Sequence, residues 1–159
     1  MHSVLFICTA NICRSPMVAA LLRDRVAGQN GDWRVASAGT WTMDDVPAAD
    51  NTIWVLRQRS IDVSKHRSRQ VTREMVDGYQ LILTMERGQK EAMQVEFPEA
   101  ADRIFLLSEM VDQVYDIPDP IGSPPAEFEL TARDFEAILG RGFDKIKRLS
   151  DESVQARGS

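Results

Sequence analysis

Cysteine, histidine and long apolar runs are all scarce in this chain of 159 residues. Two cysteines are too few for a disulfide framework, and without an export signal they favour a reducing compartment and a chemical role. The apolar run at the N-terminus is too short for a signal peptide and lacks a basic lead, so we expect a cytoplasmic location. No window approaches the length of a membrane span. The two histidines, His2 and His66, show no metal-ligand spacing, so we expect neither a metal nor a cofactor.

Positive charge is also limited, because 19 lysines and arginines stand against 24 acidic residues and give a net charge of −5. This balance argues against a nucleic-acid partner, but an anionic small substrate stays compatible because the field inside a cleft is local. The length fits one domain that buries a core without disulfides. We expect that domain over residues 1–150 and a polar, disordered tail over 151–159. The oligomeric state is open, with a monomer as the default expectation.

The most informative stretch follows the first apolar run. Residues 3–7, Ser-Val-Leu-Phe-Ile, are typical of a buried strand. Ser15 is a favourable N-cap residue, and Pro16 suits the first position of a helix, where a missing N–H is harmless. Apolar side chains then recur at helical spacing: Met17, Val18, Leu21, Leu22 and Val26. Residues 8–15, Cys-Thr-Ala-Asn-Ile-Cys-Arg-Ser, are therefore predicted to turn from a strand into a helix.

This turn predicts a site for a tetrahedral oxyanion. A tight turn into a helix N-terminus directs several backbone N–H groups into one hollow, and the helix dipole adds partial positive charge. The guanidinium of Arg14 can hold two phosphate oxygens at once, and the Cys8 thiol at the mouth of the hollow is favoured as a thiolate nucleophile. The Ser15 hydroxyl is placed to donate to that sulfur. The predicted phosphate-binding N–H groups are those of Thr9, Ala10, Asn11, Ile12, Cys13 and Arg14.

Strand and helix signals alternate along the rest of the chain. Strand–helix–strand connections of this length give parallel strands with right-handed crossovers. We therefore predict an α/β fold: one four-stranded parallel sheet of flavodoxin-like type, strand order 2-1-3-4, with helices on both faces. Gly140 and Gly142 weaken the last helix. The further strands are predicted over residues 33–38, 79–85 and 103–107, the helices over 48–59, 72–76, 86–96 and 126–149, and a turn-rich loop over 28–32.

A proline-rich segment supplies the candidate acid. Residues 116–125 contain four prolines and a glycine, so they form neither a helix nor a central strand. Cleavage of a phosphate ester leaves an oxygen that needs a proton, and Asp119, fixed between Pro118 and Pro120, fits that role. Asp116 is the rival acid. The alternative is that both acids only shape a turn, as Asp often does beside Pro.

Motifs along nearly the full chain resemble the low-molecular-weight protein tyrosine phosphatases. The resemblance implies a metal-independent hydrolase in which Cys8 is the nucleophile, Arg14 binds phosphate and Asp119 is the general acid. Its implied substrates are phosphotyrosine proteins or small aryl phosphates. The motifs are the loop at 8–16 with its Arg-Ser-Pro ending, Ser-Ala-Gly-Thr at 37–40, Ser-Lys-His-Arg-Ser-Arg-Gln at 64–70, Thr-Met-Glu at 84–86 and Asp-Ile-Pro-Asp-Pro at 116–120.

The same resemblance implies supporting roles around the loop. His66 matches a histidine that supports Asn11, a loop position where a positive φ is useful, although a surface histidine is the alternative. Trp41 matches an aromatic wall of the substrate cleft, against an ordinary core or surface tryptophan. Cys13 matches a redox partner that forms a reversible disulfide with Cys8, or else it is a small residue that packs the loop.

Other functions stay open beside phosphotyrosine hydrolysis. An arsenate reductase on the same fold would use Cys8 and Arg14, but its thioredoxin-coupled versions need a later cysteine, and none follows Cys13. A protein arginine phosphatase is a third hypothesis, yet members that resemble that activity carry Thr where Ile12 stands. A phosphate-binding module without turnover is the fourth. Most family members also carry an aromatic residue where Ile121 stands, which leaves the substrate preference open.

Overall fold

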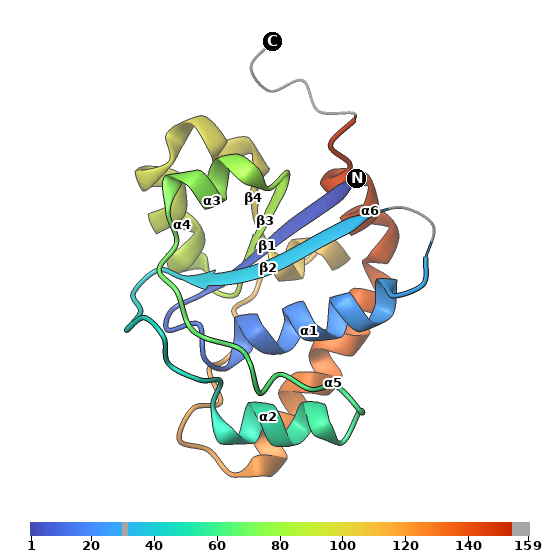
Figure 1. Cartoon of the computed structure of the whole chain (residues 1–159). Coiled ribbons are helices and arrows are strands. Elements are labelled where there is room, and N and C mark those ends of the chain that lie inside the picture. Colours follow the sequence, from blue (N-terminus) through green and yellow to red (C-terminus); the bar gives the residue numbers. More distant parts are fainter. Residues whose placement is uncertain (30–31, 154–159) are drawn as a thin grey trace.

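The computed structural model describes residues 1–29 and 32–153, and its centre is one parallel sheet (Figure 1). All strand pairs are parallel and the order is β2-β1-β3-β4, which confirms the predicted fold class. The carboxyl ends of the two central strands, β1 and β3, therefore lie side by side at one edge, where open α/β sheets bind their ligands. The strands are β1 (His2–Cys8), β2 (Trp33–Gly39), β3 (Leu81–Thr84) and β4 (Ile104–Leu106).

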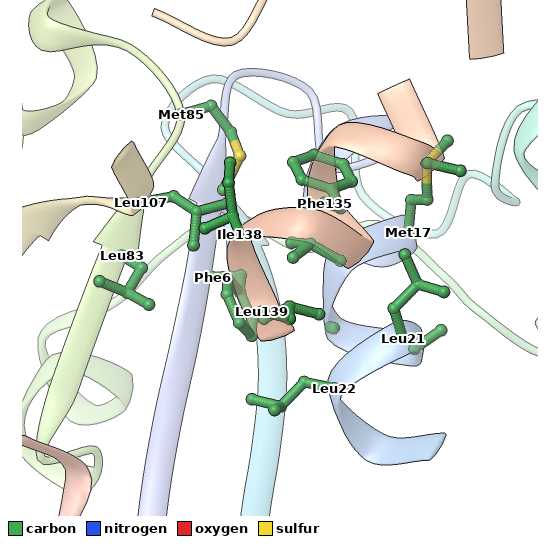
Figure 2. Close-up of a cluster of buried hydrophobic side chains, with 14 of the residues drawn as sticks. Phe6, Met17, Leu21, Leu22, Leu83, Met85, Leu107, Phe135, Ile138 and Leu139 are labelled. Carbon is green, nitrogen blue, oxygen red and sulfur yellow. The ribbon is translucent and has the colours of Figure 1, made fainter. Parts of the chain in front are cut away.

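Strand β1 is buried on both faces because helices cover both sides of the sheet. Its side chains alternate, so Val4 and Phe6 join one apolar cluster while Leu5 and Ile7 join the other. Figure 2 shows part of the first cluster, with Phe6 among side chains of α1 and α5. Each of these four side chains is fully buried, which contributes roughly 1.5–3 kcal/mol apiece to folding.

The helices divide between the two faces of the sheet. The first cluster takes its helical side chains mainly from α1 (Arg14–Val26), α2 (Asp50–Arg57), α5 (Pro125–Arg141) and α6 (Phe143–Ser150). The second takes them from α3 (Arg73–Gly78), α4 (Arg87–Glu96) and the 3-10 helix η1 (Pro98–Arg103). A second 3-10 helix, η2 (Leu107–Val111), follows β4. No helix in the described part of the chain combines the length and the apolar character needed to cross a membrane.

The prediction of one continuous last helix over 126–149 is wrong. The chain breaks between α5 and α6 at Gly142, whose N–H still donates to the Ile138 carbonyl. A Cβ on Gly142 would lie only 2.7 Å from the Met110 carbonyl oxygen, so the close approach of η2 requires glycine there. Gly140 has no comparable contact and stays inside α5.

The first residues of the predicted tail contact the N-terminal strand. Asp151 forms an antiparallel bridge with His2, and the Glu152 N–H donates to the Met1 carbonyl over 3.1 Å. The His2 ring stacks on Trp33, which fixes the start of β1 at the end of the sheet opposite to the loop. Asp151 and Glu152 thus contact the N-terminus, whereas the rest of the predicted tail, 154–159, lies outside the described residues, as do positions 30 and 31 of the predicted 28–32 loop.

Candidate active site

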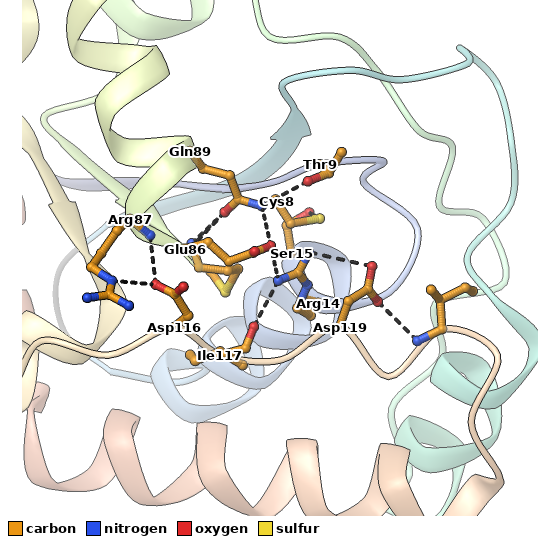
Figure 3. Close-up of polar contacts among 12 residues, drawn as sticks. Cys8, Thr9, Arg14, Ser15, Glu86, Arg87, Gln89, Asp116, Ile117 and Asp119 are labelled. Atoms are coloured by element: carbon orange, nitrogen blue, oxygen red, sulfur yellow. Dashed lines mark hydrogen bonds and ion pairs between the residues drawn. The ribbon is translucent and has the colours of Figure 1, made fainter.

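The loop predicted to bind phosphate joins β1 to α1, but the helix begins earlier than the sequence suggested. It starts at Arg14, so Ser15 lies within its first turn and the prediction that Ser15 caps the helix is wrong. The Ser15 hydroxyl instead lies 2.9 Å from the Cys8 sulfur, and both groups are buried (Figure 3). The contact has the geometry needed for the predicted donation to sulfur.

Asn11 ties the loop together from within. Its φ of 59° lies in the left-handed region, as expected for this position. Its buried side-chain amide donates from Nδ2 to the hydroxyls of Ser15 (2.8 Å) and Ser37 (2.9 Å), and the side-chain oxygen Oδ1 accepts the backbone N–H of Arg69 (3.1 Å). Because the Ser15 oxygen already accepts this N–H, its own hydrogen is free to be donated to the Cys8 sulfur.

The carbonyl groups of the loop are held from outside. His66 Nε2 donates to the backbone carbonyl of Asn11 (2.8 Å), so this nitrogen carries a proton. Burial lowers the pKa of His66 below its ordinary value. The N–H of Ala49, just before α2, donates to the Ile12 carbonyl (2.8 Å), and the Trp41 N–H donates to the Thr9 carbonyl (3.0 Å). A loop whose carbonyls turn outward presents its N–H groups to the opposite side, as in an anion-binding nest.

Arg14 is the buried cation of the site, with 2% of its surface exposed. Its Nη1 donates to Glu86 Oε2 (2.6 Å) and to the Ile117 carbonyl (2.8 Å), and its Nη2 lies 3.5 Å from Asp119 Oδ2 (Figure 3). Its Nε is buried and has no hydrogen-bond partner among residues 1–29 and 32–153. The edge formed by Nε and Nη2 is therefore the part of the guanidinium that remains for a ligand with two oxygens.

The two acids of the proline-rich segment have different surroundings. Asp116 Oδ1 accepts the backbone N–H (2.9 Å) and Nε (3.2 Å) of Arg87, and the backbone N–H above all holds the pKa of Asp116 below its ordinary range. Asp119 lies beside Arg14, and its Oδ1 accepts the Ile121 N–H (3.0 Å). The structure thus brings Asp119 to the phosphate loop and engages its rival Asp116 with a surface arginine.

Two residues of this site, Glu86 and Gln89, were given no role from the sequence, although Glu86 ends the Thr-Met-Glu motif at 84–86. Glu86 precedes α4 and caps it together with Gln89, three residues later. That Glu-x-x-Gln spacing is a recognisable helix-start signal, but it gives no hint that the Glu86 carboxylate also holds Arg14. Ser37 and Arg69, which bind the Asn11 amide, lie in the motifs at 37–40 and 64–70 but were likewise given no role.

The remaining predicted residues lie around the loop. Trp41 is 82% exposed, which excludes the core alternative for this residue, and Ile121 on the Asp119 segment is also exposed. Cys8 and Cys13 are both buried free thiols, and burial raises the pKa of Cys13 to about 12. The Cys8–Cys13 disulfide stays a prediction. Among the residues that the structure describes, no three His, Cys, Asp or Glu side chains are grouped as metal ligands.

A cysteine and a buried arginine on a loop at the carboxyl end of a parallel sheet fit the class of small α/β enzymes that bind a tetrahedral oxyanion beside a cysteine. A family model described as "Low molecular weight phosphotyrosine protein phosphatase" matches residues 3–153, so the chain belongs to that family.

Named relatives include phosphatases of two specificities. The probable low molecular weight protein-tyrosine-phosphatase EpsP of Ralstonia solanacearum is 37% identical over 142 residues, covering 89% of this chain and 91% of that protein. A protein-arginine-phosphatase of Geobacillus stearothermophilus is 34% identical over 147 residues, covering 92% and 97%. The crystal structure of a low molecular weight protein tyrosine phosphatase from T. tengcongensis matches with a TM-score of 0.87 and 32% identity, covering 91% of this chain and 99% of that one.

Proposed function

We propose that this chain hydrolyses phosphotyrosine in proteins, and small aryl phosphates, through a cysteinyl-phosphate intermediate and without a metal. The observation that carries the proposal is the guanidinium of Arg14. Protein groups hold its Nη1 side, while its buried Nε has no partner in the part of the chain that the structure describes, so an edge with two donors is left beside the Cys8 loop. A phosphoryl group supplies the two oxygens that this edge needs.

In the first step the Cys8 thiolate attacks phosphorus in line with the ester bond. An S–P bond forms, the P–O bond breaks, and Asp119 gives its proton to the leaving oxygen. The Nε–Nη2 edge of Arg14 and the backbone N–H groups of residues 9–14 bind the three equatorial oxygens, where negative charge is spread in the transition state. No electron acceptor is involved, because sulfur returns unchanged at the end of the cycle.

In the second step water attacks phosphorus and the S–P bond breaks. The Asp119 carboxylate takes a proton from the water, and Cys8 leaves as a thiolate. The Ser15 hydroxyl, 2.9 Å from that sulfur, stabilises the departing charge. The side chains of Asn11 and His66 do not touch the substrate in this mechanism, because their contacts are to Ser15, Ser37 and backbone groups.

We assign the substrate as an aryl ester because of the surroundings of the loop. Trp41 is exposed and follows Thr40, and its backbone is bound to Thr9, so its ring can form one wall for a tyrosyl group. Exposed Ile121 offers a smaller apolar surface on the Asp119 segment. The similarity to arginine phosphatases makes phosphoarginine the competing substrate, and Ile12, in place of the threonine of members that resemble that activity, favours tyrosine.

The test compares two peptides that differ only in the phosphorylated residue. We expect hydrolysis of a phosphotyrosyl peptide and of p-nitrophenyl phosphate, little hydrolysis of the phosphoarginyl peptide, and none of these activities in Cys8→Ser. Rapid acid quench of the wild-type reaction should trap phosphate on Cys8. Faster hydrolysis of the phosphoarginyl peptide would overturn the specificity, and turnover by Cys8→Ser would overturn the mechanism.

We also propose a cytoplasmic location, since a nucleophilic thiol needs a reducing compartment and both cysteines are free in the structure.

Asp119→Ala, which should retain phosphate binding while its turnover is slowed, is the variant with which to capture a phosphoprotein substrate from a lysate. A bound protein that carries no phosphotyrosine would contradict the substrate class.

A further inference from the structure

Gln89, in the first turn of α4, uses both ends of its carboxamide. The side chain is buried, with 6% exposed. Its Oε1 accepts the backbone N–H groups of Met85 (3.0 Å) and Glu86 (2.9 Å), which caps the helix. These two donors also fix the orientation of the amide, because a rotated carboxamide would turn its own N–H groups towards them.

The Nε2 end of Gln89 faces the phosphate loop. It donates to the Thr9 hydroxyl oxygen (3.0 Å) and to Glu86 Oε2 (3.1 Å), and Figure 3 shows Gln89 reaching both residues. Thr9 directly follows Cys8. Glu86 Oε2 is the same oxygen that accepts Arg14 Nη1 at 2.6 Å. A single amide thus connects the end of the loop that carries the nucleophile with the carboxylate that holds the arginine.

We propose that Gln89 is a positioning residue for phosphate: it holds Thr9 and Glu86 together so that the Cys8 sulfur and the Arg14 guanidinium face one phosphoryl group. The inference rests on the proposed function for its place in the reaction. It concerns binding of the oxyanion itself, however, and can be measured without turnover. Gln89 touches neither substrate nor sulfur, and acts through Thr9 and Glu86.

Gln89→Glu separates this role from helix capping. A glutamate keeps the acceptor oxygen that the N–H groups of Met85 and Glu86 need, and Glu or Gln serve equally at this position of a capping box. It loses both N–H donors, however, and places a second carboxylate beside Glu86. The helix cap is retained, while the links to Thr9 and Glu86 are broken.

We expect Gln89→Glu to bind inorganic phosphate about tenfold more weakly than wild type at pH 7, the cost of a lost hydrogen bond to a charged group. The second-order rate of Cys8 alkylation by iodoacetate, itself an anion, should fall as well. The midpoint of urea unfolding should change little. Titration calorimetry with inorganic phosphate at pH 7 measures the affinity.

Gln94→Glu is the matched control. Gln94 is a half-buried glutamine on the same helix, and its Nε2 donates to the Ala101 carbonyl (3.1 Å), away from the phosphate loop. The control therefore has the same change of charge and also loses a hydrogen bond, but it should retain wild-type phosphate affinity. Thr9→Val removes the hydroxyl that accepts Gln89 Nε2. It should lower phosphate affinity less when Gln89→Glu is already present than it does in the wild type.

The outcomes separate this inference from the proposed function. Equal phosphate affinity in Gln89→Glu and Gln94→Glu would overturn the positioning role, as would a loss that merely follows a lowered stability. If the two variants differ in phosphate affinity but wild type does not hydrolyse phosphotyrosine, the proposed function fails and the positioning role stands. A wild-type chain that binds no phosphate would overturn both.

Discussion

Asn11→Ala tests how strongly the loop is built before any ligand arrives. The asparagine is fully buried, and its amide makes three hydrogen bonds, to Ser15, Ser37 and the Arg69 N–H. Its backbone also sits at a φ of 59°, a conformation that asparagine tolerates better than alanine. Alanine removes all three bonds and keeps the unfavourable φ.

The size of the effect follows from these contacts. Each buried hydrogen bond contributes about 1 kcal/mol net, so the three together account for roughly 3 kcal/mol. An alanine at this φ adds about 1 kcal/mol more. The total of about 4 kcal/mol is a large part of the roughly 5–15 kcal/mol that stabilises an ordinary domain. Asn11→Gly loses the same bonds but avoids the backbone strain, so it should be more stable than Asn11→Ala by about 1 kcal/mol.

Urea unfolding of wild type, Asn11→Ala and Asn11→Gly measures these differences. The kcat with p-nitrophenyl phosphate reports whether the loop keeps its geometry. Both variants should lose activity, because Ser15 loses the donor that directs its own hydrogen to the Cys8 sulfur. Asn51→Ala is the control: this half-buried asparagine on α2 has no side-chain hydrogen bond within the described ranges, so its stability should change by only about 0.5 kcal/mol. An Asn11→Ala protein within about 1 kcal/mol of wild type would refute the reasoning.

Three further predictions concern single groups. Asp119→Asn should lower kcat about 10²–10⁴-fold for phenyl phosphate and far less for dinitrophenyl phosphate, and an equal loss on both would exclude Asp119 as the acid. Burial lowers the pKa of His66 below its ordinary 6.5, so near this pH the unfolded chain binds more protons than the folded one. The free energy of unfolding, measured with urea, should therefore fall as the pH drops through 6.5, and its dependence on pH should be weaker in His66→Gln. Because burial raises the pKa of Cys13 to about 12, iodoacetate at pH 7 should label Cys8 alone; label on Cys13 in Cys8→Ser, detected by mass spectrometry, would contradict this.

The fold could be predicted because its signals are local. Strand β1 carries apolar side chains on both faces, and each strand is followed by a helix pattern, which together define a parallel sheet covered on both sides. The break at Gly142 could not be predicted in the same way. It depends on the Met110 carbonyl, which lies far away in the sequence and approaches too closely for a Cβ. The two glycines, Gly140 and Gly142, indicated that the last helix is weak, but they did not indicate at which residue it ends.

The site divides along the same line. Cys8, Asn11, Arg14 and Ser15 lie in one segment, so their types and order already indicate an oxyanion loop. The Arg14–Glu86 pair joins residues from two different strand ends, and no short-range pattern records it. Ser15 shows the opposite error, since a favourable capping residue is used instead in a contact with sulfur. Capping propensity fails here because the helix already begins at Arg14 and the Ser15 hydroxyl is used within the loop.

The contacts of Arg14 also explain why the acid and the cation of this site must act together. Without a ligand, Asp119 lies 3.5 Å from Nη2, where two oxygens of a phosphoryl group are to bind. In the proposed first step an oxygen of the phosphoryl group takes this place beside Nη2, and Asp119 gives its proton to the bridging oxygen of the ester. Glu86 stays in place, because its carboxylate is held by Arg14 Nη1 and by Gln89 on the side away from the free edge. Glu86 therefore fixes the Arg14 guanidinium, whereas Asp119 gives up its place beside Nη2 to the substrate.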